Sequence, residues 1–211
     1  MNRGFLNGPY CPIYGCGAIL NILFLGAIEN TVLLFLAAAL LTGALEYLTS
    51  WGMEKLFHAR WWDYSDKKFN IHGRVYLTGA AVFGSFSVLL MKIVHPFVTG
   101  ITTALPPYVL SAAAMMLLAI LLADTIFTVT KFSEFNSLLR NVSVAADDAR
   151  ESVKMLRVLA GASFRSRFRK FNSQIYRMLS SFPKLTSTKY SESLRFLREL
   201  IFRHNINDKL R

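Results

Sequence analysis

Residues 108–129 read YVLSAAAMMLLAILLADTIFTV, a run in which Asp124 is the only charged side chain. About 20 apolar residues in helical conformation are enough to cross the hydrocarbon of a bilayer. The whole chain is 53% hydrophobic with a mean hydropathy of +0.36, and its apolar residues come in blocks of this kind. The sequence therefore predicts an all-α membrane protein built from several transmembrane helices.

The other apolar blocks lie upstream of this run. Residues 75–93 form a second block, rich in Ala, Gly and Ser, and residues 13–57 are apolar almost throughout except at Glu29-Asn30. Two alternatives fit the upstream block. Spans near 13–28 and 31–50 can be joined by a tight turn, or residues 18–41 can form one span at a cost of about 2.5–3.5 kcal/mol for the central Glu29.

The loop between the upstream block and residue 75 decides between these alternatives. Loops on the cytoplasmic side carry an excess of Lys and Arg, and this loop holds Arg60, Lys67, Lys68 and Arg74. Two upstream helices put this loop and the basic C-terminal part on the cytoplasmic side. We therefore expect about four spans in a transmembrane domain of residues 1–130, near 13–28, 31–50, 75–93 and 108–129. A re-entrant first segment stays open as an alternative.

Residues 131–211 predict a basic cytoplasmic tail. They hold 17 Lys and Arg against 7 Asp and Glu, whereas residues 1–130 hold 7 against 6. The periodicity predicts helices near 143–160, 164–182 and 191–204, the first with Ser143 as its N-cap. In the middle helix, basic residues alternate with an apolar stripe and form a candidate lipid-binding set: Arg165, Arg167, Arg169, Lys170 and Arg177.

A basic amphipathic helix can lie on anionic lipid, dock into a protein groove or bind nucleic acid. The chain is already tethered to a membrane and has no nucleic-acid motif, so anionic lipid of the cytoplasmic leaflet is the preferred partner and nucleic acid is not expected. The structural alternative is a small helical bundle whose arginines are solvated.

Three ionisable residues, Glu46, Arg74 and Asp124, are expected at one depth near the cytoplasmic ends of their helices. Intramembrane charges are costly and usually pair or line a polar cavity. One hypothesis is a polar site facing the cytosol. The structural alternative is an ion pair of Arg74 with Asp124 or with Glu46 that fixes the helix register. Around Glu46, small and polar residues favour close helix packing: Thr42, Gly43, Thr49 and Ser50.

Motifs of catalysis are missing from the sequence. It contains no Gly-x-x-x-x-Gly-Lys-Ser/Thr loop, no Gly-x-Ser-x-Gly elbow and no His-Glu-x-x-His pair. Cys11 and Cys16 have no further Cys or His at the spacing of a zinc site. We therefore expect no catalytic, cofactor or metal site, and any ATP-driven activity requires an ATPase on a separate subunit.

Two stretches carry a family resemblance: Asn2-Arg3-Gly4-Phe5-Leu6-Asn7-Gly8-Pro9-Tyr10-Cys11-Pro12-Ile13-Tyr14-Gly15, and Arg60-Trp61-Trp62-Asp63-Tyr64-Ser65 with Phe69-Asn70-Ile71-His72-Gly73-Arg74. Together with Leu45-Glu46-Tyr47 they resemble the bacterial integral-membrane family called Putative ABC-transporter type IV, or CmpB-like, over about residues 2–130. Members typically have a further hydrophobic segment before the first motif, so the full product is expected to have five or more spans.

The resemblance implies a permease-like subunit in the bacterial inner membrane, with a separate ATPase as its partner and a homo-oligomer as one assembly. The loop is then a candidate coupling or interfacial element, formed by Arg60, Trp61, Trp62, Asp63, Tyr64, Asn70, Gly73 and Arg74. A non-transporting scaffold or regulator with a lipid-binding or protein-binding tail is the alternative. A lipid-modifying enzyme using Asp63, Asp66 or His72 is the weakest hypothesis.

Overall fold

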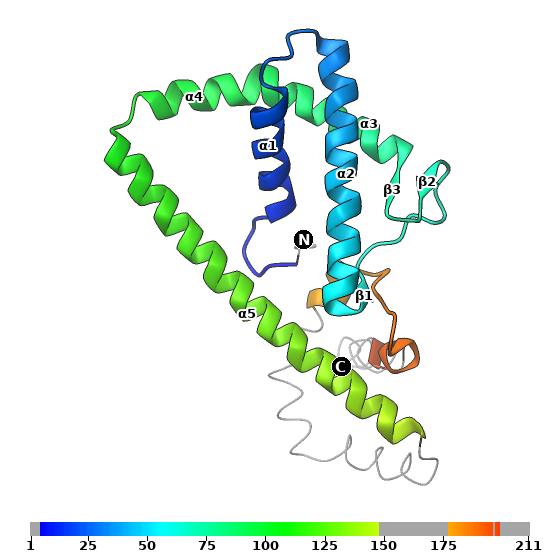
Figure 1. Ribbon diagram of the computed structural model, residues 1–211. Coiled ribbons are helices and arrows are strands. Elements are labelled where there is room, and N and C mark those ends of the chain that lie inside the picture. The colour runs from blue at the N-terminus through cyan, green and yellow to red at the C-terminus, as the bar shows by residue number, and fades with distance from the viewer. Residues whose placement is uncertain (1–4, 148–176, 196, 199–211) are drawn as a thin grey trace, which may run out of the picture. The chain divides into compact units, whose positions relative to one another are not determined.

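The computed structural model describes residues 5–147, 177–195 and 197–198 (Figure 1). Helices dominate, as expected, and the described residues form two compact units. Unit 1 contains residues 5–9, 58–61 and the described residues from 124 onward. Unit 2 contains residues 10–57 and 62–123. Each unit is described by itself below.

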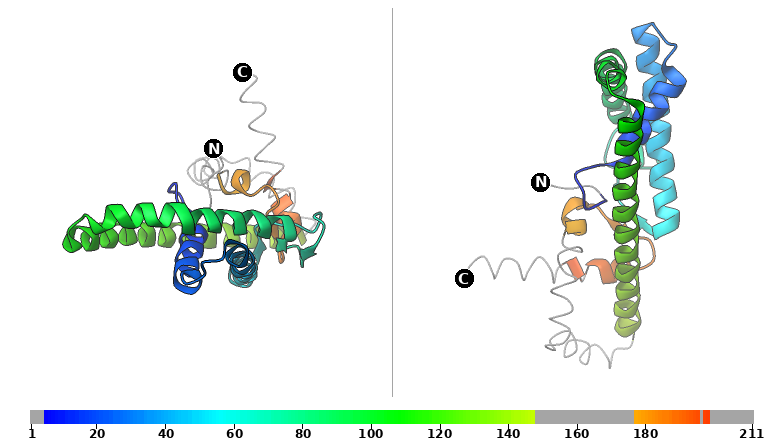
Figure 2. Two further views of the ribbon diagram at one scale, coloured as in Figure 1. Left: turned by 90° about the horizontal axis from the view of Figure 1, so that it is seen from above. Right: turned by 90° about the vertical axis from the view of Figure 1, so that its left-hand side faces the viewer.

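Unit 2 begins with two helices joined by a turn. Helix α1 (Pro12–Leu25) starts with a proline, whose missing N–H is not needed in a first helical turn. Helix α2 (Thr31–Phe57) is capped by the Asn30 side-chain oxygen, which accepts from the N–H groups of Val32 and Leu33 at 3.0 Å. The helices lie side by side in both sets of views (Figures 1 and 2). The chain therefore turns at Glu29-Asn30, as the first of the two alternatives predicted.

Three helical segments are long and apolar enough to cross a membrane: Thr31–Phe57, Leu77–Thr103 and Pro107–Ser137. Most of their apolar surface is exposed to the surroundings, as lipid-facing side chains are. Helix α1 has 14 residues, or about 21 Å at 1.5 Å per residue, and this is shorter than the ~30 Å of the hydrocarbon layer. The described residues thus confirm three of the expected spans as candidates, and the count of four is not confirmed.

The helical path of the span expected near 75–93 continues beyond residue 93. Helix α3 (Leu77–Leu89) passes through a π-helical turn, η1 (Leu90–Val94), into α4 (His95–Thr103). A proline inside a helix normally interrupts it, because it removes a hydrogen bond and crowds the preceding turn. In the structure Pro96 occupies the first turn of α4, where it is tolerated. The wider π turn just before it lets the helical path continue.

Helix α5 (Pro107–Asp147) continues through residue 130 and through Ser143. The expectation that Ser143 caps a new helix is therefore wrong. Its hydroxyl donates to the Arg140 carbonyl at 2.7 Å, inside the same helix. No Gly or Pro interrupts residues 108–147, so nothing in the sequence ends the helix after the apolar run.

Close contacts between small residues hold α1, α2 and α3 together. A Cβ added at Gly84 would come within 3.0 Å of the Phe35 carbonyl oxygen and 3.1 Å of Ala39, so α3 meets α2 at this glycine. A cluster centred on Leu25, Leu34 and Ala38 fills the region near the α1–α2 turn. Gly43 faces Val75 and Ala80 in the same way. The small-residue stripe predicted around Glu46 is thus partly used for packing.

Unit 1 has a core centred on Trp61, which is 2% exposed. Its indole ring lies about 5 Å from three phenylalanine rings, at 5.0 Å from Phe5, 5.1 Å from Phe132 and 5.0 Å from Phe182. Strand β1 (Ala59–Arg60) pairs antiparallel with β4 (Thr186–Ser187). The described tail residues therefore belong to one folded unit with the start of the chain. Buried leucines complete this core: Leu6, Leu139, Leu179, Leu185, Leu194 and Leu197.

The short strands were not expected from a sequence read as all-α. Besides β1 and β4, strands β2 (Asn70–Ile71) and β3 (Val75–Tyr76) form a hairpin in unit 2. Most of the predicted tail helix 164–182 lies outside the described residues, and so do Arg165, Arg167, Arg169 and Lys170.

Candidate functional site

The predicted loop divides between the two units. Arg60 and Trp61 lie in unit 1, one in strand β1 and the other in the core. The other six predicted loop residues lie in unit 2, where residues 62–76 form what we call the hairpin loop. They are Trp62, Asp63, Tyr64, Asn70, Gly73 and Arg74. Sequence composition alone did not indicate that two adjacent tryptophans separate in this way.

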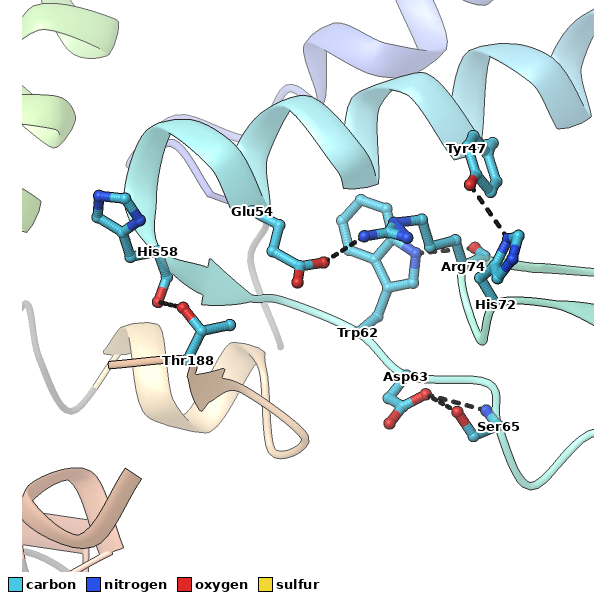
Figure 3. Close-up of polar contacts among 9 residues, drawn as sticks. All are labelled: Tyr47, Glu54, His58, Trp62, Asp63, Ser65, His72, Arg74 and Thr188. Atoms are coloured by element: carbon cyan, nitrogen blue, oxygen red, sulfur yellow. Dashed lines mark hydrogen bonds and ion pairs between the residues drawn. The ribbon is translucent and has the colours of Figure 1, made fainter. Parts of the chain in front are cut away.

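The turn of the hairpin loop requires a glycine. Gly73 has φ +66°, and His72 before it has φ +52°, in the left-handed region that glycine adopts at least cost. A side chain at Gly73 would collide with Asp63 Oδ1 and Ser65 Oγ. Asp63 Oδ1 in turn accepts hydrogen bonds from the Ser65 N–H at 3.0 Å and from its hydroxyl at 2.6 Å (Figure 3). Such an aspartate-centred turn stabilises the loop locally.

Backbone hydrogen bonds close the hairpin loop. The Tyr64 N–H donates to the Gly73 carbonyl at 2.8 Å, and the Gly73 N–H donates to Asn70 Oδ1 at 2.9 Å. The Asn70 amide group also donates to the Lys67 carbonyl at 2.7 Å. The Trp62 indole N–H donates to the Arg74 carbonyl at 3.2 Å. These bonds give the loop a defined conformation of its own.

Arg74 joins the hairpin loop to α2. Its guanidinium lies 2.6 Å from the Glu54 carboxylate, and the two side chains are 12% and 24% exposed (Figure 3). The same guanidinium lies over the Tyr47 ring, 5.4 Å from its centroid. The Tyr47 hydroxyl hydrogen-bonds His72 Nδ1 at 3.2 Å. Glu54 and Tyr47 are seven residues apart, so both lie on one face of α2.

Sequence analysis had considered Glu46 and Asp124 as partners for Arg74. The structure places Glu54 there, a residue that the sequence pattern did not indicate. The expected span ended at residue 50, and this put Glu54 in the loop, whereas α2 continues to Phe57. The available signal was an acidic residue about one helical turn after Ser50, the last polar residue of the stripe.

Glu46 lies buried in unit 2, at 7% exposed. The Tyr64 hydroxyl hydrogen-bonds its carboxylate, while Oε2 has no hydrogen-bond partner. Asn21 on α1 is 1% exposed; its amide group donates to the Gly17 carbonyl at 2.7 Å, and its Oδ1 is also without a partner. A buried acceptor left unsatisfied costs about 1–3 kcal/mol. Two such acceptors therefore stand out on facing helices.

Tyr64 connects the hairpin loop to this buried carboxylate. Burial, the negative charge of Glu46 and the nearby Tyr76 together raise the pKa of Tyr64 to about 12. Its ring lies 4.7 Å from the Tyr76 ring. The phenol consequently stays protonated at neutral pH and remains a hydrogen-bond donor to Glu46.

In unit 1, Asp124 and Arg177 hold the N-terminal motif. The Asp124 carboxylate accepts from the Asn7 amide at 2.7 Å and from the Gly8 N–H at 2.8 Å. The Arg177 guanidinium donates to the Leu6 carbonyl at 2.6 Å and to the Phe5 carbonyl at 3.3 Å. Hydrogen bonds to charged groups are the stronger ones in proteins. Lipid binding by Arg177, as by the rest of its predicted set, stays a prediction.

Comparison with known proteins identifies the family. Residues 1–129 match the model of a family described as Putative ABC-transporter type IV. A search of curated proteins and a search of solved structures each found no match. The matched residues make up more than half of the chain and contain all three candidate spans up to residue 129. This membrane protein therefore belongs to the Putative ABC-transporter type IV family.

Proposed function

We propose that the chain is a permease-like transmembrane subunit of an ABC-type transporter, and that a separate subunit supplies the ATPase. The family description and the three candidate spans support this proposal. The sequence contains no P-loop, which supports a separate subunit as the source of ATP hydrolysis. The proposed role of this chain is therefore mechanical. A conformational change of the ATPase has to be transmitted to the membrane helices.

The observation that carries the proposal is the attachment of the hairpin loop to two candidate spans. Arg74 fixes the loop to α2 through Glu54. Strand β3 leads without a break into α3 at Leu77. A force on the loop therefore acts on α2 and α3 together, and these two helices pack closely at Gly84. This is the connection that a coupling element requires.

The tip of the hairpin loop offers the docking surface. Lys67 and Lys68 are exposed there, beside Phe69 at 78% and Ile71 at 57% exposed. Phe69 has φ +53°, a backbone conformation that costs free energy for a bulky residue. Exposed apolar side chains next to positive charges fit a partner groove that is apolar with an acidic rim.

The sidedness of the membrane is consistent with this role. The Lys and Arg content of the loop and of the tail favours the cytoplasmic side for both. Two candidate spans separate them, and an even number returns the chain to the same side. The pairing of β1, directly after α2, with β4 in the tail supports the same arrangement. An ATPase in the cytoplasm would then meet the hairpin loop.

Cross-linking from the loop tip tests the proposal. A photoreactive amino acid at Phe69 in the full chain, in its native membrane, should cross-link to a protein that contains a P-loop, identified by mass spectrometry. The double change Lys67→Glu and Lys68→Glu should remove this cross-link and the co-purifying ATPase activity. Lys189→Glu, an exposed charge reversal in the tail, is the matched control and should leave both unchanged. Cross-links to lipid alone would instead favour the non-transporting scaffold.

A further inference from the structure

Helix α4 has one apolar and one polar side. At 3.6 residues per turn, Phe97, Val98 and Ile101 fall within an arc of about 100°. The opposite side carries polar side chains: His95, Thr99, Thr102 and Thr103. The three apolar side chains are 69%, 46% and 50% exposed, so the described residues leave this side uncovered. An amphipathic helix of this kind is suited to a boundary between water and an apolar phase.

Lys92 marks the place where the helical path from α3 reaches the bilayer surface. It is the only Lys or Arg between Arg74 and Lys131. Its ammonium group donates to the Glu29 carbonyl at 2.9 Å, and Glu29 is an exposed acidic residue in the turn between α1 and α2. A charged turn between two apolar helices lies at the water boundary, because a charge inside the hydrocarbon is costly. The Lys92 ammonium is therefore held at the same boundary.

The length of the helical path leads to the same boundary. Helices α3 and η1, which are 13 and 5 residues long, together extend about 27 Å, close to the ~30 Å of the hydrocarbon layer. The whole segment Leu77–Thr103 has 27 residues and extends about 40 Å. A π turn is a common cause of helix bends, and the path bends between α3 and α4 (Figure 1). Helix α4 is thus the part of the segment that one crossing does not require.

The other end of α4 is tied to the same surface. The apolar run 108–129 extends about 33 Å, so α5 uses nearly all of it to cross and enters the bilayer close to Pro107. The N–H groups of Ala104 and Leu105 donate to the carbonyls of Ile101 and Thr102, both at 3.2 Å. The connection to α5 is therefore a turn and not an extended strand. Both ends of α4 consequently lie near one surface of the bilayer, where lipid is the apolar phase within reach.

We propose that α4 is an interfacial helix that binds the lipid surface on the side of the membrane away from the hairpin loop. Phe97, Val98 and Ile101 lie among the acyl chains, and the threonine side faces water. The membrane-crossing part of Leu77–Thr103 then ends at η1. This contact with lipid goes beyond the proposed function and holds whether or not the chain has an ATPase partner.

Spin labels on the two sides of α4 test this placement. Oxygen concentrates in hydrocarbon and a nickel chelate stays in water, so the ratio of their collision rates with a label reports its surroundings. The full chain, with Cys11→Ser and Cys16→Ser, is placed in nanodiscs of phosphatidylethanolamine and phosphatidylglycerol. Labels at Phe97→Cys and Ile101→Cys should show an oxygen-to-nickel ratio roughly threefold or more above that of labels at Thr99→Cys and Thr103→Cys.

Two matched positions calibrate the ratio. Leu118→Cys, at a side chain that is 54% exposed in the middle of the α5 run, is the hydrocarbon reference, and Lys67→Cys in the exposed loop is the water reference. Each pair on α4, Phe97 with Thr99 or Ile101 with Thr103, gives the comparison by itself if a variant of the other pair does not fold.

Three results would overturn the proposal. Ratios like that of the water reference at all four positions would place α4 in water, away from the lipid. Ratios like that of Leu118→Cys at all four would place it inside the hydrocarbon. Low collision rates with both reagents at Phe97 and Ile101 would show that protein, such as a second copy of the chain, covers the apolar side.

Discussion

The guanidinium of Arg74 lies 2.6 Å from the carboxylate of Glu54, and this contact is the ion pair that ties the hairpin loop to α2. Both side chains are largely withdrawn from solvent, so screening by water and salt is weaker than for a surface pair. The Tyr47 ring, 5.4 Å from the guanidinium, covers the same group. The loop is thus attached at its C-terminal end, three residues before α3 begins at Leu77.

Glu54→Gln should release the hairpin loop. A hydrogen bond to a charged group contributes about 1.5–3 kcal/mol, so amide hydrogen exchange of residues 62–76 should accelerate by at least tenfold. Glu134→Gln breaks the exposed pair with Lys131, whose members are 38% and 50% exposed, and should cost less than about 1 kcal/mol. Equal exchange in both variants would show that the Arg74 contact does not hold the loop.

Gly73→Ala should distort the turn of the same loop. The left-handed conformation costs a residue with a side chain about 1–2 kcal/mol, and the new Cβ also collides with Asp63 and Ser65. Gly52→Ala is the matched control on α2, where an added Cβ meets nothing within 4 Å and helix propensity should improve by about 0.5–1 kcal/mol. Thermal unfolding of the two variants should therefore shift in opposite directions; a stabilising Gly73→Ala would contradict the geometry.

The sequence predicts this molecule best where long apolar runs determine the structure. The helices beginning at Thr31 and Pro107 were expected within one residue of where they begin, because turn residues precede each of them. The positions where the helices end were harder to predict. Polar residues predict where a span leaves the membrane, yet α2 continues past Ser50, which is buried in the protein, as far as Phe57.

The site could be predicted only in part, because the residue types do not reveal which partner each side chain finds. Glu46 and Arg74 were singled out, but Glu54 was not, and a pairing across α2 and the hairpin loop depends on where the helix ends. Trp61 and Trp62 are the same residue type at adjacent positions, so the sequence does not distinguish them. One fills the core of unit 1, and the other binds a backbone carbonyl in unit 2.

The raised pKa of Tyr64 predicts its behaviour in alkaline solution. The folded-state pKa of about 12 exceeds the ordinary value of 10.0, so the contribution of this phenol to stability is complete below pH 10 and is lost as the pH rises toward 12. The tyrosinate absorbance of the unaltered chain minus that of Tyr64→Phe should rise with a midpoint near 12. Circular dichroism at each pH has to confirm that the chain is still folded. A midpoint near 10 in folded protein would contradict the burial of the phenol.

Trp61→Ala should remove the centre of the unit 1 core. Truncation of a fully buried large aromatic costs about 3–5 kcal/mol, and three phenylalanine rings lose their common contact. Trp51→Ala is the natural control, because the Trp51 side chain on α2 is 48% exposed. Limited proteolysis should then cut the tail near residues 177–198 in Trp61→Ala and spare it in Trp51→Ala. Equal protection in both would mean that Trp61 does not organise the tail.

Asp124→Asn should loosen the N-terminal motif, because the substitution replaces one acceptor oxygen by a donor. Asn7 and Gly8 each donate to a different oxygen of the carboxylate, so the substitution removes the charge from their acceptor and leaves one acceptor oxygen for the two donors. Each lost bond to a charged group is worth about 1.5–3 kcal/mol, and the Gly8 amide should exchange at least tenfold faster. Glu192→Gln disrupts only an exposed pair with Arg195 and should leave that amide unchanged. Faster exchange at Gly8 with unchanged exchange across α5 would locate the effect at the contact between Asp124 and the N-terminal motif. Unchanged exchange at Gly8 would show that Asp124 does not hold the motif.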